Sequence, residues 1–281
     1  MVYFQILSPK LKSMKNLTSK YGNRVLITGG SSGIGKAFAI ELTKQGFQPI
    51  IVARNQRKLD TISLQLEMEY KVKPLTYSVD LSDENQVLDF LSEIQNEDIG
   101  LFIHCAGMEN NGAMIKIAPL KELQLLKLNV NATYLLTNHF AKRMKEQQLG
   151  GILLVSSMAA LMPTPYFSNY AASKSYVHNF GLSLYTELKK HGVDVSVLAP
   201  GLTETNMVAD NGVNWEKLPV SSMSANEVAR ISLAKLGKKA TIIPGFKNKM
   251  MVAVAKRVFS QRSFSAINGA LIRKGMMAQN I

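Results

Sequence analysis

The chain has 281 residues, of which 46% are hydrophobic and 19% charged, so it can bury one large core but has little room for two full α/β domains. Its single cysteine, Cys105, excludes an internal disulfide and fits a reducing, cytoplasmic setting. The four histidines lack close zinc-type spacing, so we expect no metal site.

The net charge of +13 is unevenly distributed. Residues 1–40 hold six Lys or Arg, residues 228–281 hold eleven, and neither segment holds an acidic residue. Such ends could meet an anionic membrane surface, a phosphate-bearing substrate or nucleic acid, or could be solvated faces that aid solubility. No apolar run approaches the roughly 18 residues of a membrane-spanning helix, and the short N-terminal apolar stretch does not resemble a secretory signal.

Short apolar runs alternate with amphipathic stretches along the chain. The predicted strands are residues 24–28, 49–53, 75–79, 101–104, 152–155, 193–199 and 241–243. The predicted helices include residues 34–45, a stretch ending near residue 70, and residues 84–96, 120–148, 169–190 and 225–236. This alternation predicts a single-domain, Rossmann-type α/β fold with a doubly wound, seven-stranded parallel sheet, helices on both faces and ligands at the carboxyl ends of the strands.

Three segments lie outside this alternation. Residues 1–22 are expected to be a basic N-terminal extension to a catalytic domain over residues 23–244. Within that domain, residues 206–224 form a long polar insertion and a candidate substrate lid. Residues 245–281 are expected to be a basic helical tail, which could be an interfacial helix, a subunit contact or a packed helix.

A glycine-rich turn follows the first predicted strand and opens the first long helix. It reads Thr28-Gly29-Gly30-Ser31-Ser32-Gly33-Ile34-Gly35. Glycines let the backbone turn sharply and approach a pyrophosphate, whose charge is met by free N–H groups and the positive end of the helix dipole. The turn therefore predicts a dinucleotide site.

Tyr170 and Lys174 stand four residues apart in a predicted helix, so their side chains share one face. A phenol's pKa of about 10 is too high for proton exchange at neutral pH, and a nearby ammonium would lower it. Alone, such a pair is more often an ordinary feature of an amphipathic helix. Together with the glycine turn, it points to hydride-transfer chemistry.

The ordered motifs resemble those of the short-chain dehydrogenase/reductase family over residues 24–205. The glycine turn matches the pattern T-G-x-x-x-G-I-G, and further matches are Asp80-Leu81, Ala106-Gly107, Asn129, Ser157, Tyr170-x-x-x-Lys174 and Pro200-Gly201 with Thr205. The resemblance implies that Tyr170 is the general acid and that Ser157 holds the carbonyl oxygen by a hydrogen bond. It also implies that Lys174 lowers the pKa of Tyr170 and binds the nicotinamide ribose. Asn129 would hold a water that relays protons. It implies a cofactor site made of Gly29, Ser31, Ser32, Gly33, Ile34, Gly35, Arg54, Asp80, Leu81, Ala106, Gly107, Tyr170, Lys174, Pro200, Gly201, Thr203 and Thr205.

The residues after the second strand favour NADP(H). Arg54 follows Ala53, and no acid occurs before Asp60, so a cation stands where an adenosine 2′-phosphate would lie. Alternatively, Arg54 and Arg57 only solvate the start of the helix. Asp80 resembles the residue that binds the adenine amino group, but it could equally be a helix cap. The family usually has asparagine where this chain has His104, which we expect to be structural.

A hydrophobic carbonyl substrate is expected because apolar residues flank the motifs in sequence, namely Met108, Met114, Leu161, Met162, Tyr166 and Phe167. The resemblance is strongest to 3-ketodihydrosphingosine reductases and very-long-chain 3-oxoacyl-CoA reductases, which reduce a ketone beside a long acyl chain at membranes. A steroid or small-carbonyl reductase and a non-catalytic dinucleotide-sensing protein remain alternatives.

The resemblance also suggests partners. A homodimer or homotetramer would form through the helices of residues 120–148 and 169–190, as is common in the family. The basic termini would contact an anionic membrane peripherally. A nucleic-acid partner is not expected, because no recognised motif or aromatic stacking platform accompanies the positive charge.

Overall fold

Seven parallel strands form the central sheet of the computed structural model, which describes residues 17–276. In spatial order they are β3 (Leu75–Ser78), β2 (Gln48–Ala53), β1 (Arg24–Thr28), β4 (Leu101–His104), β5 (Gly150–Val155), β6 (Val193–Leu198) and β9 (Thr241–Ile242). The order reverses between β1 and β4, so a crevice opens at their carboxyl ends. The predicted fold class and the seven-stranded parallel sheet are confirmed.

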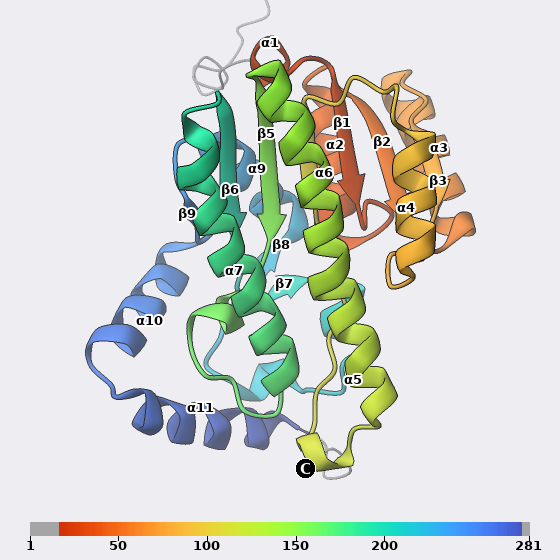
Figure 1. Cartoon of the computed structure of the whole chain (residues 1–281). Helices are drawn as coiled ribbons and strands as arrows, with labels where there is room; N and C mark the ends of the chain where they lie inside the picture. The colour runs from red at the N-terminus through yellow and green to blue at the C-terminus, as the bar shows by residue number, and fades with distance from the viewer. Residues whose placement is uncertain (1–16, 277–281) are drawn as a thin grey trace, which may run out of the picture.

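Helices cover both faces of the sheet (Figure 1). One face packs against α2 (Gly33–Lys44), α3 (Gln56–Tyr70) and α9 (Ala225–Lys235), and the other against α4 (Glu84–Glu93), α6 (Ala132–Gln147) and α7 (Ser168–Lys189). Successive strand residues point to opposite faces, so Leu26 and Phe102 join one core while Ile27 and Ile103 join the other. All four are fully buried, which explains why the strands read as continuous apolar runs.

The single helix expected over residues 120–148 consists of three segments in the structure. They are α5 (Pro119–Leu126), a π-helical turn at Lys127–Asn131 and α6. The π-helical turn carries Asn129, whose fully buried side chain bonds to the loop after β4. A π-helical turn holds one residue more than a regular α-helical turn, so the segment is not one regular helix. Such turns are often found at functional positions.

The insertion before α9 is bracketed by a parallel pair of two-residue strands, β7 (Thr203–Glu204) and β8 (Met223–Ser224). It contains α8 (Asn206–Ala209) and a 3₁₀ turn at Trp215–Lys217. Its far end packs on the C-terminal segment: Asn214 N–H donates to Gly275 O at 2.8 Å, and Val213 forms a bridge with Met276.

Two further helices follow the last strand of the sheet: α10 (Phe246–Arg257) and α11 (Gln261–Gly275). Figure 1 shows α10 beside the sheet and α11 running beneath the carboxyl ends of the strands. At the other end of the chain, α1 (Leu17–Tyr21) is the first described element. Most of the expected basic N-terminal extension, residues 1–16, and residues 277–281 of the tail lie outside the described residues.

Candidate active site

The glycine turn lies between the carboxyl end of β1 and the start of α2. Gly29 and Gly33 have φ angles of +67° and +52°, which favour glycine. A Cβ on Gly35 would lie 2.2 Å from Gly29 O, and one on Gly29 would lie 2.9 Å from the Ala106 backbone. Ser32 precedes α2 without capping it through its side chain, so the first turn of the helix keeps donors for an anion. The turn therefore fits a dinucleotide pyrophosphate.

The adenosine end of such a dinucleotide would meet Arg54 and Asp80. The Arg54 side chain is 73% exposed, and its Nη1 lies 3.9 Å from Asp80 Oδ2. Asp80 Oδ1 accepts from the Ser82 N–H and hydroxyl at 2.9 and 2.7 Å. The cap of α4 is Asp83, not Asp80, so the capping alternative for Asp80 is wrong. Leu81 beside it is buried.

Thr28, the last residue of β1, ties the glycine turn to the loop after β4. Its hydroxyl bonds to His104 Nδ1 at 2.9 Å and accepts from the Cys105 and Ala106 N–H groups, each at 3.1 Å. Burial lowers the pKa of His104 to about 3, so the ring is neutral, and burial raises the pKa of Cys105 to about 12. These contacts join strands, as expected of a structural His104.

Asn129, Gly107 and Lys174 converge beside this loop. Asn129 Oδ1 accepts from Met108 N–H at 3.0 Å, and its Nδ2 donates to Met108 O at 2.9 Å and to Ser173 Oγ at 3.0 Å. A Cβ on Gly107 would lie 3.0 Å from Lys174 Nζ and 3.2 Å from Asn129 Oδ1. Lys174 Nζ donates to Val155 O at 3.1 Å. A side chain at position 107 would therefore crowd the lysine and the asparagine, which glycine leaves room for.

Ser157 and Tyr170 present their hydroxyls to the same cavity. Ser157 follows β5 in an extended conformation, and its Oγ accepts from Ala159 N–H at 3.1 Å. The preceding Ser156 is buried and donates to Lys174 O at 2.7 Å. Tyr170 lies in the first turn of α7 and shares a hydrogen bond with Ser157, while Lys174 Nζ lies 5.9 Å from the Tyr170 ring centroid. Thus Ser157, Tyr170 and Lys174 come together.

The electrostatics of this group differ from the sequence-based expectation. Burial, followed by the nearby Glu109 carboxylate, raises the pKa of Tyr170 above its ordinary value, and the hydrogen bond with Ser157 only partly opposes this. Burial also lowers the pKa of Lys174 to about 8. The sequence-based expectation of a Tyr170 pKa below its ordinary value is therefore not met: desolvation dominates the shift, and Lys174 is not among the groups that cause it. The phenol keeps its proton at neutral pH.

Glu109 is a site residue that the sequence analysis missed. It lines the same cavity as Tyr170, and its Oε1 accepts from Asn211 Nδ2 at 2.8 Å. Burial raises the pKa of its carboxyl group. No motif contains Glu109; the only available signal was an acid directly after the Ala106-Gly107-Met108 run.

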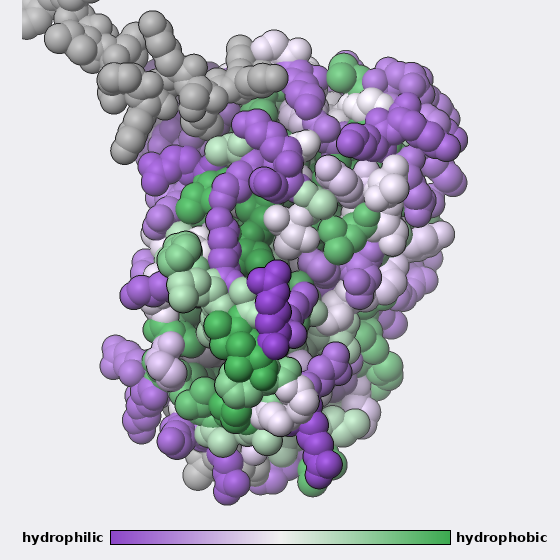
Figure 2. Space-filling model, turned by 90° about the vertical axis from the view of Figure 1, so that its left-hand side faces the viewer, coloured by the Kyte–Doolittle hydropathy of each residue, from purple (hydrophilic) through white to green (hydrophobic). Residues whose placement is uncertain are grey.

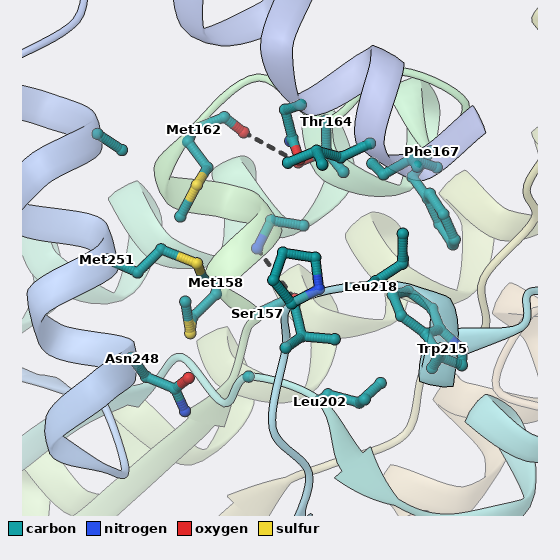
Figure 3. Close-up of a pocket in the computed structure, with 18 of the residues that line it drawn as sticks. Ser157, Met158, Met162, Thr164, Phe167, Leu202, Trp215, Leu218, Asn248 and Met251 are labelled. Carbon is teal, nitrogen blue, oxygen red and sulfur yellow. Dashed lines mark hydrogen bonds between the residues drawn. The ribbon is translucent and has the colours of Figure 1, made fainter. Parts of the chain in front are cut away.

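The cavity has a volume of about 830 Å³ and is lined mainly by apolar side chains (Figure 3). Figure 3 shows Met251 of α10 pointing towards Met158, with Trp215 and Leu218 of the insertion on the opposite wall. Of the apolar residues expected near the substrate, Met162 and Phe167 line the cavity. Met108, Met114, Leu161 and Tyr166 do not, and Met114 is 70% exposed. The wall from α10 and α11 was not predicted.

The segment after β6 joins the cavity to the glycine turn. Pro200 and Gly201 line the cavity, and Pro200 O accepts from Met158 N–H at 2.9 Å. Thr203 Oγ1 donates to Gly201 O at 3.0 Å, and a Cβ on Gly33 would lie 3.0 Å from Thr205 Cγ2. This segment therefore runs from the cavity to the glycine turn. Within residues 17–276, no group of three or more His, Cys, Asp or Glu side chains could hold a metal ion.

Comparisons with known proteins agree with this geometry. Residues 23–214 match the family model described as short chain dehydrogenase. A very-long-chain 3-oxoacyl-CoA reductase-like protein of Arabidopsis thaliana is 33% identical over 225 residues, which cover 78% of this chain and 71% of that protein. A 7beta-hydroxysteroid dehydrogenase of Mediterraneibacter gnavus is 27% identical over 239 residues, covering 84% and 91%.

One of the similar solved structures is a complex with a cofactor. The short-chain dehydrogenase from Sphingobium yanoikuyae in complex with NADPH superposes with a TM-score of 0.74 at 26% identity, covering 90% of this chain and 93% of that one. The family model alone covers well over half of the chain. The protein therefore belongs to the short-chain dehydrogenase family of oxidoreductases.

Proposed function

We propose that the protein is an NADPH-dependent reductase that converts a hydrophobic ketone into a secondary alcohol, or catalyses the reverse oxidation. The observation that carries this proposal is the pairing of the Tyr170 and Ser157 hydroxyls in a large, mostly apolar cavity, beside the cluster of Asn129, Gly107 and Lys174. A ketone there would have its oxygen near two hydroxyls and its apolar parts against the cavity wall.

The roles proposed for these residues follow from their protonation and bonding. Tyr170 keeps its proton at neutral pH and would donate it to the developing alkoxide, which Ser157 would steady with a hydrogen bond. When bound, the nicotinamide supplies the hydride. Lys174 would hold the nicotinamide ribose. Asn129, fixed by Met108 and Ser173, would orient the water that resupplies protons to Lys174.

NADP(H) is the proposed cofactor, with the predicted glycine-turn, loop and strand-end residues as its site. An NADPH complex of a relative and the exposed Arg54 guanidinium support this choice. Arg54→Ala should raise the KM for NADPH about tenfold, because a charge-assisted bond to the 2′-phosphate is lost, and should leave the KM for NADH unchanged. Steady-state kinetics with both cofactors measure this.

Arg57→Ala is the matched control for the Arg54 variant, since Arg57 is also exposed and lies in the first turn of α3. It should change neither KM. A wild-type preference for NADH, or equal effects of the two substitutions, would contradict the assignment of Arg54.

Glu109 should affect how the rate of ketone reduction depends on pH. Its negative charge raises the pKa of both Lys174 and Tyr170, so Glu109→Gln should lower both. The alkaline limb of the kcat/KM profile for ketone reduction, set near the Lys174 pKa of about 8, should then move to lower pH. Asp210→Asn removes a nearby carboxylate on a neighbouring cavity and should leave the limb in place. An unmoved limb in Glu109→Gln would exclude this coupling.

The proposed substrate is a ketone beside a long acyl chain, such as a 3-oxoacyl or 3-ketosphinganine-like compound. The size of the cavity and the Arabidopsis relative support it. A steroid ketone is the second candidate, supported by the hydroxysteroid dehydrogenase relative. The test is NADPH oxidation across 3-oxoacyl thioesters, 3-ketosphinganine, steroids and small diketones. Failure on every long-chain member would reject the first candidate, and failure on all ketones would reject the function.

Assembly and location complete the proposal. We propose a homodimer or homotetramer built through α5, α6 and α7, where Leu120, Leu123 and Tyr134 are exposed. We also propose a cytoplasmic protein whose basic ends contact anionic membranes peripherally. Among the described residues, no helix has the length and apolar character needed to cross a bilayer.

A further inference from the structure

One face of α10 is apolar although it is exposed. Phe246, Met250 and Val254 are spaced four residues apart, and Val258 follows at the same interval. Their side chains are 74%, 51%, 44% and 68% exposed, respectively. Asn248, Val252 and Ala255 form the opposite, buried face. The exposed stripe is therefore not needed for packing α10 against the domain.

The cavity reaches the surface at this stripe. Met250, Met251 and Val254 of α10 and Ile267 of α11 line the cavity and are also between 39% and 51% exposed. Phe259, in the connection between the two helices, lines it as well and is 38% exposed. The opening is thus rimmed by apolar side chains, which water would not favour.

Positive charge surrounds the opening. Seven basic residues lie on α10 and α11, all of them exposed: Lys247, Lys249, Lys256, Arg257, Arg262, Arg273 and Lys274. Residues 246–275 contain no acidic residue, and none of these seven cations forms a salt bridge within the described chain. Figure 2, which views the molecule from the α10 side, shows apolar side chains gathered in its lower half with hydrophilic ones around them.

The apolar stripe and the positive charge around it together indicate what kind of partner binds this face. A second copy of the chain packed symmetrically on the same face would place like charges together, which is unfavourable. An anionic bilayer instead accepts apolar side chains into its interface and attracts the surrounding lysines and arginines. We propose that α10 and α11 dock on an anionic lipid surface, and that the hydrophobic ketone enters the cavity from the bilayer through the opening between them. The entry step rests on the proposed reductase function; the docking does not.

Vesicle sedimentation tests the docking directly. The wild-type chain should bind vesicles of phosphatidylcholine containing phosphatidylglycerol and should stay in solution with phosphatidylcholine alone. The double variant F246E/V258E changes two exposed residues that do not line the cavity, and it should weaken binding about tenfold or more, since apolar insertion is lost and negative charge faces the lipid. The matched control is L64E/M68E, an equally exposed apolar pair on α3, which should bind like the wild type.

Two presentations of substrate test the entry step. Both double variants should reduce a water-soluble ketone at the wild-type rate, whereas F246E/V258E should reduce a long-chain ketone embedded in anionic vesicles about tenfold more slowly. Wild-type protein that ignores anionic vesicles, or F246E/V258E that binds them unchanged, would overturn the docking. A variant that alters only the oligomeric state would assign the face to a second copy. Vesicle binding without turnover of any ketone would reject the reductase function and leave the docking surface standing.

Discussion

A Tyr170→Phe protein is expected to fold, to bind NADPH and to reduce ketones about 10²- to 10⁴-fold more slowly than the wild type, which is the usual contribution of a positioned general acid. The substitution removes only the hydroxyl that shares a hydrogen bond with Ser157. Burial keeps that hydroxyl protonated at neutral pH, as the proposed role of proton donor in the direction of reduction requires. The loss should appear in kcat, with NADPH affinity measured separately by fluorescence titration.

Tyr176→Phe is the matched control. Tyr176 lies on the same helix, stacks on Phe180 at a centroid distance of 5.5 Å and does not line the cavity. It should retain wild-type turnover. Full activity in Tyr170→Phe would exclude the mechanism, while a wild-type chain that binds NADPH and turns over no ketone would favour the dinucleotide-sensing alternative.

Gly35→Ala should cost about 2 to 4 kcal/mol of folding stability and weaken NADPH binding about tenfold or more, because the added methyl group overpacks backbone rather than a movable side chain. The new Cβ would lie 2.2 Å from Gly29 O and 2.7 Å from Gly29 C. Gly29 opens the same turn, so relieving the clash would displace the backbone that faces the pyrophosphate. Chemical denaturation and NADPH titration measure the two effects.

Gly22→Ala separates this clash from ordinary backbone strain. Gly22 has a φ of +74°, but a Cβ there meets nothing within 4 Å. It should lose about 1 kcal/mol of stability through its conformation alone and keep its NADPH affinity. If Gly35→Ala bound NADPH as tightly as Gly22→Ala does, the turn would not be the pyrophosphate site.

The sheet could be predicted, and the candidate catalytic residues could be singled out, because their sequence signals are local. Strands buried on both faces read as short apolar runs, and Leu26, Ile27, Phe102 and Ile103 are all fully buried as such runs require. The glycines of the first turn are recognisable in the sequence because positive φ angles and close backbone contacts there exclude larger residues. Tyr170 and Lys174 are close in space because one helix holds both.

Other features depend on contacts between distant segments and leave no local signal. The π-helical turn carries Asn129, whose side chain bonds to Met108 far away in the sequence, and helical periodicity alone does not distinguish such a turn from a regular helix. The pKa of Tyr170 depends on burial and on Glu109, which a count of nearby lysines cannot supply. Helical spacing predicted part of the C-terminal tail, but it did not indicate which side of α10 is buried and which stays exposed.

Two of the helices that wall the cavity, α10 and α11, come after the last strand of the sheet, whereas the Ser157 and Tyr170 hydroxyls and the glycine turn precede it. Substitutions or length changes confined to α10 and α11 would reshape this wall without moving those hydroxyls or the glycine turn. Substrate preference can therefore diverge during evolution by remodelling one end of the gene, while the chemistry of the ancestral scaffold is inherited intact.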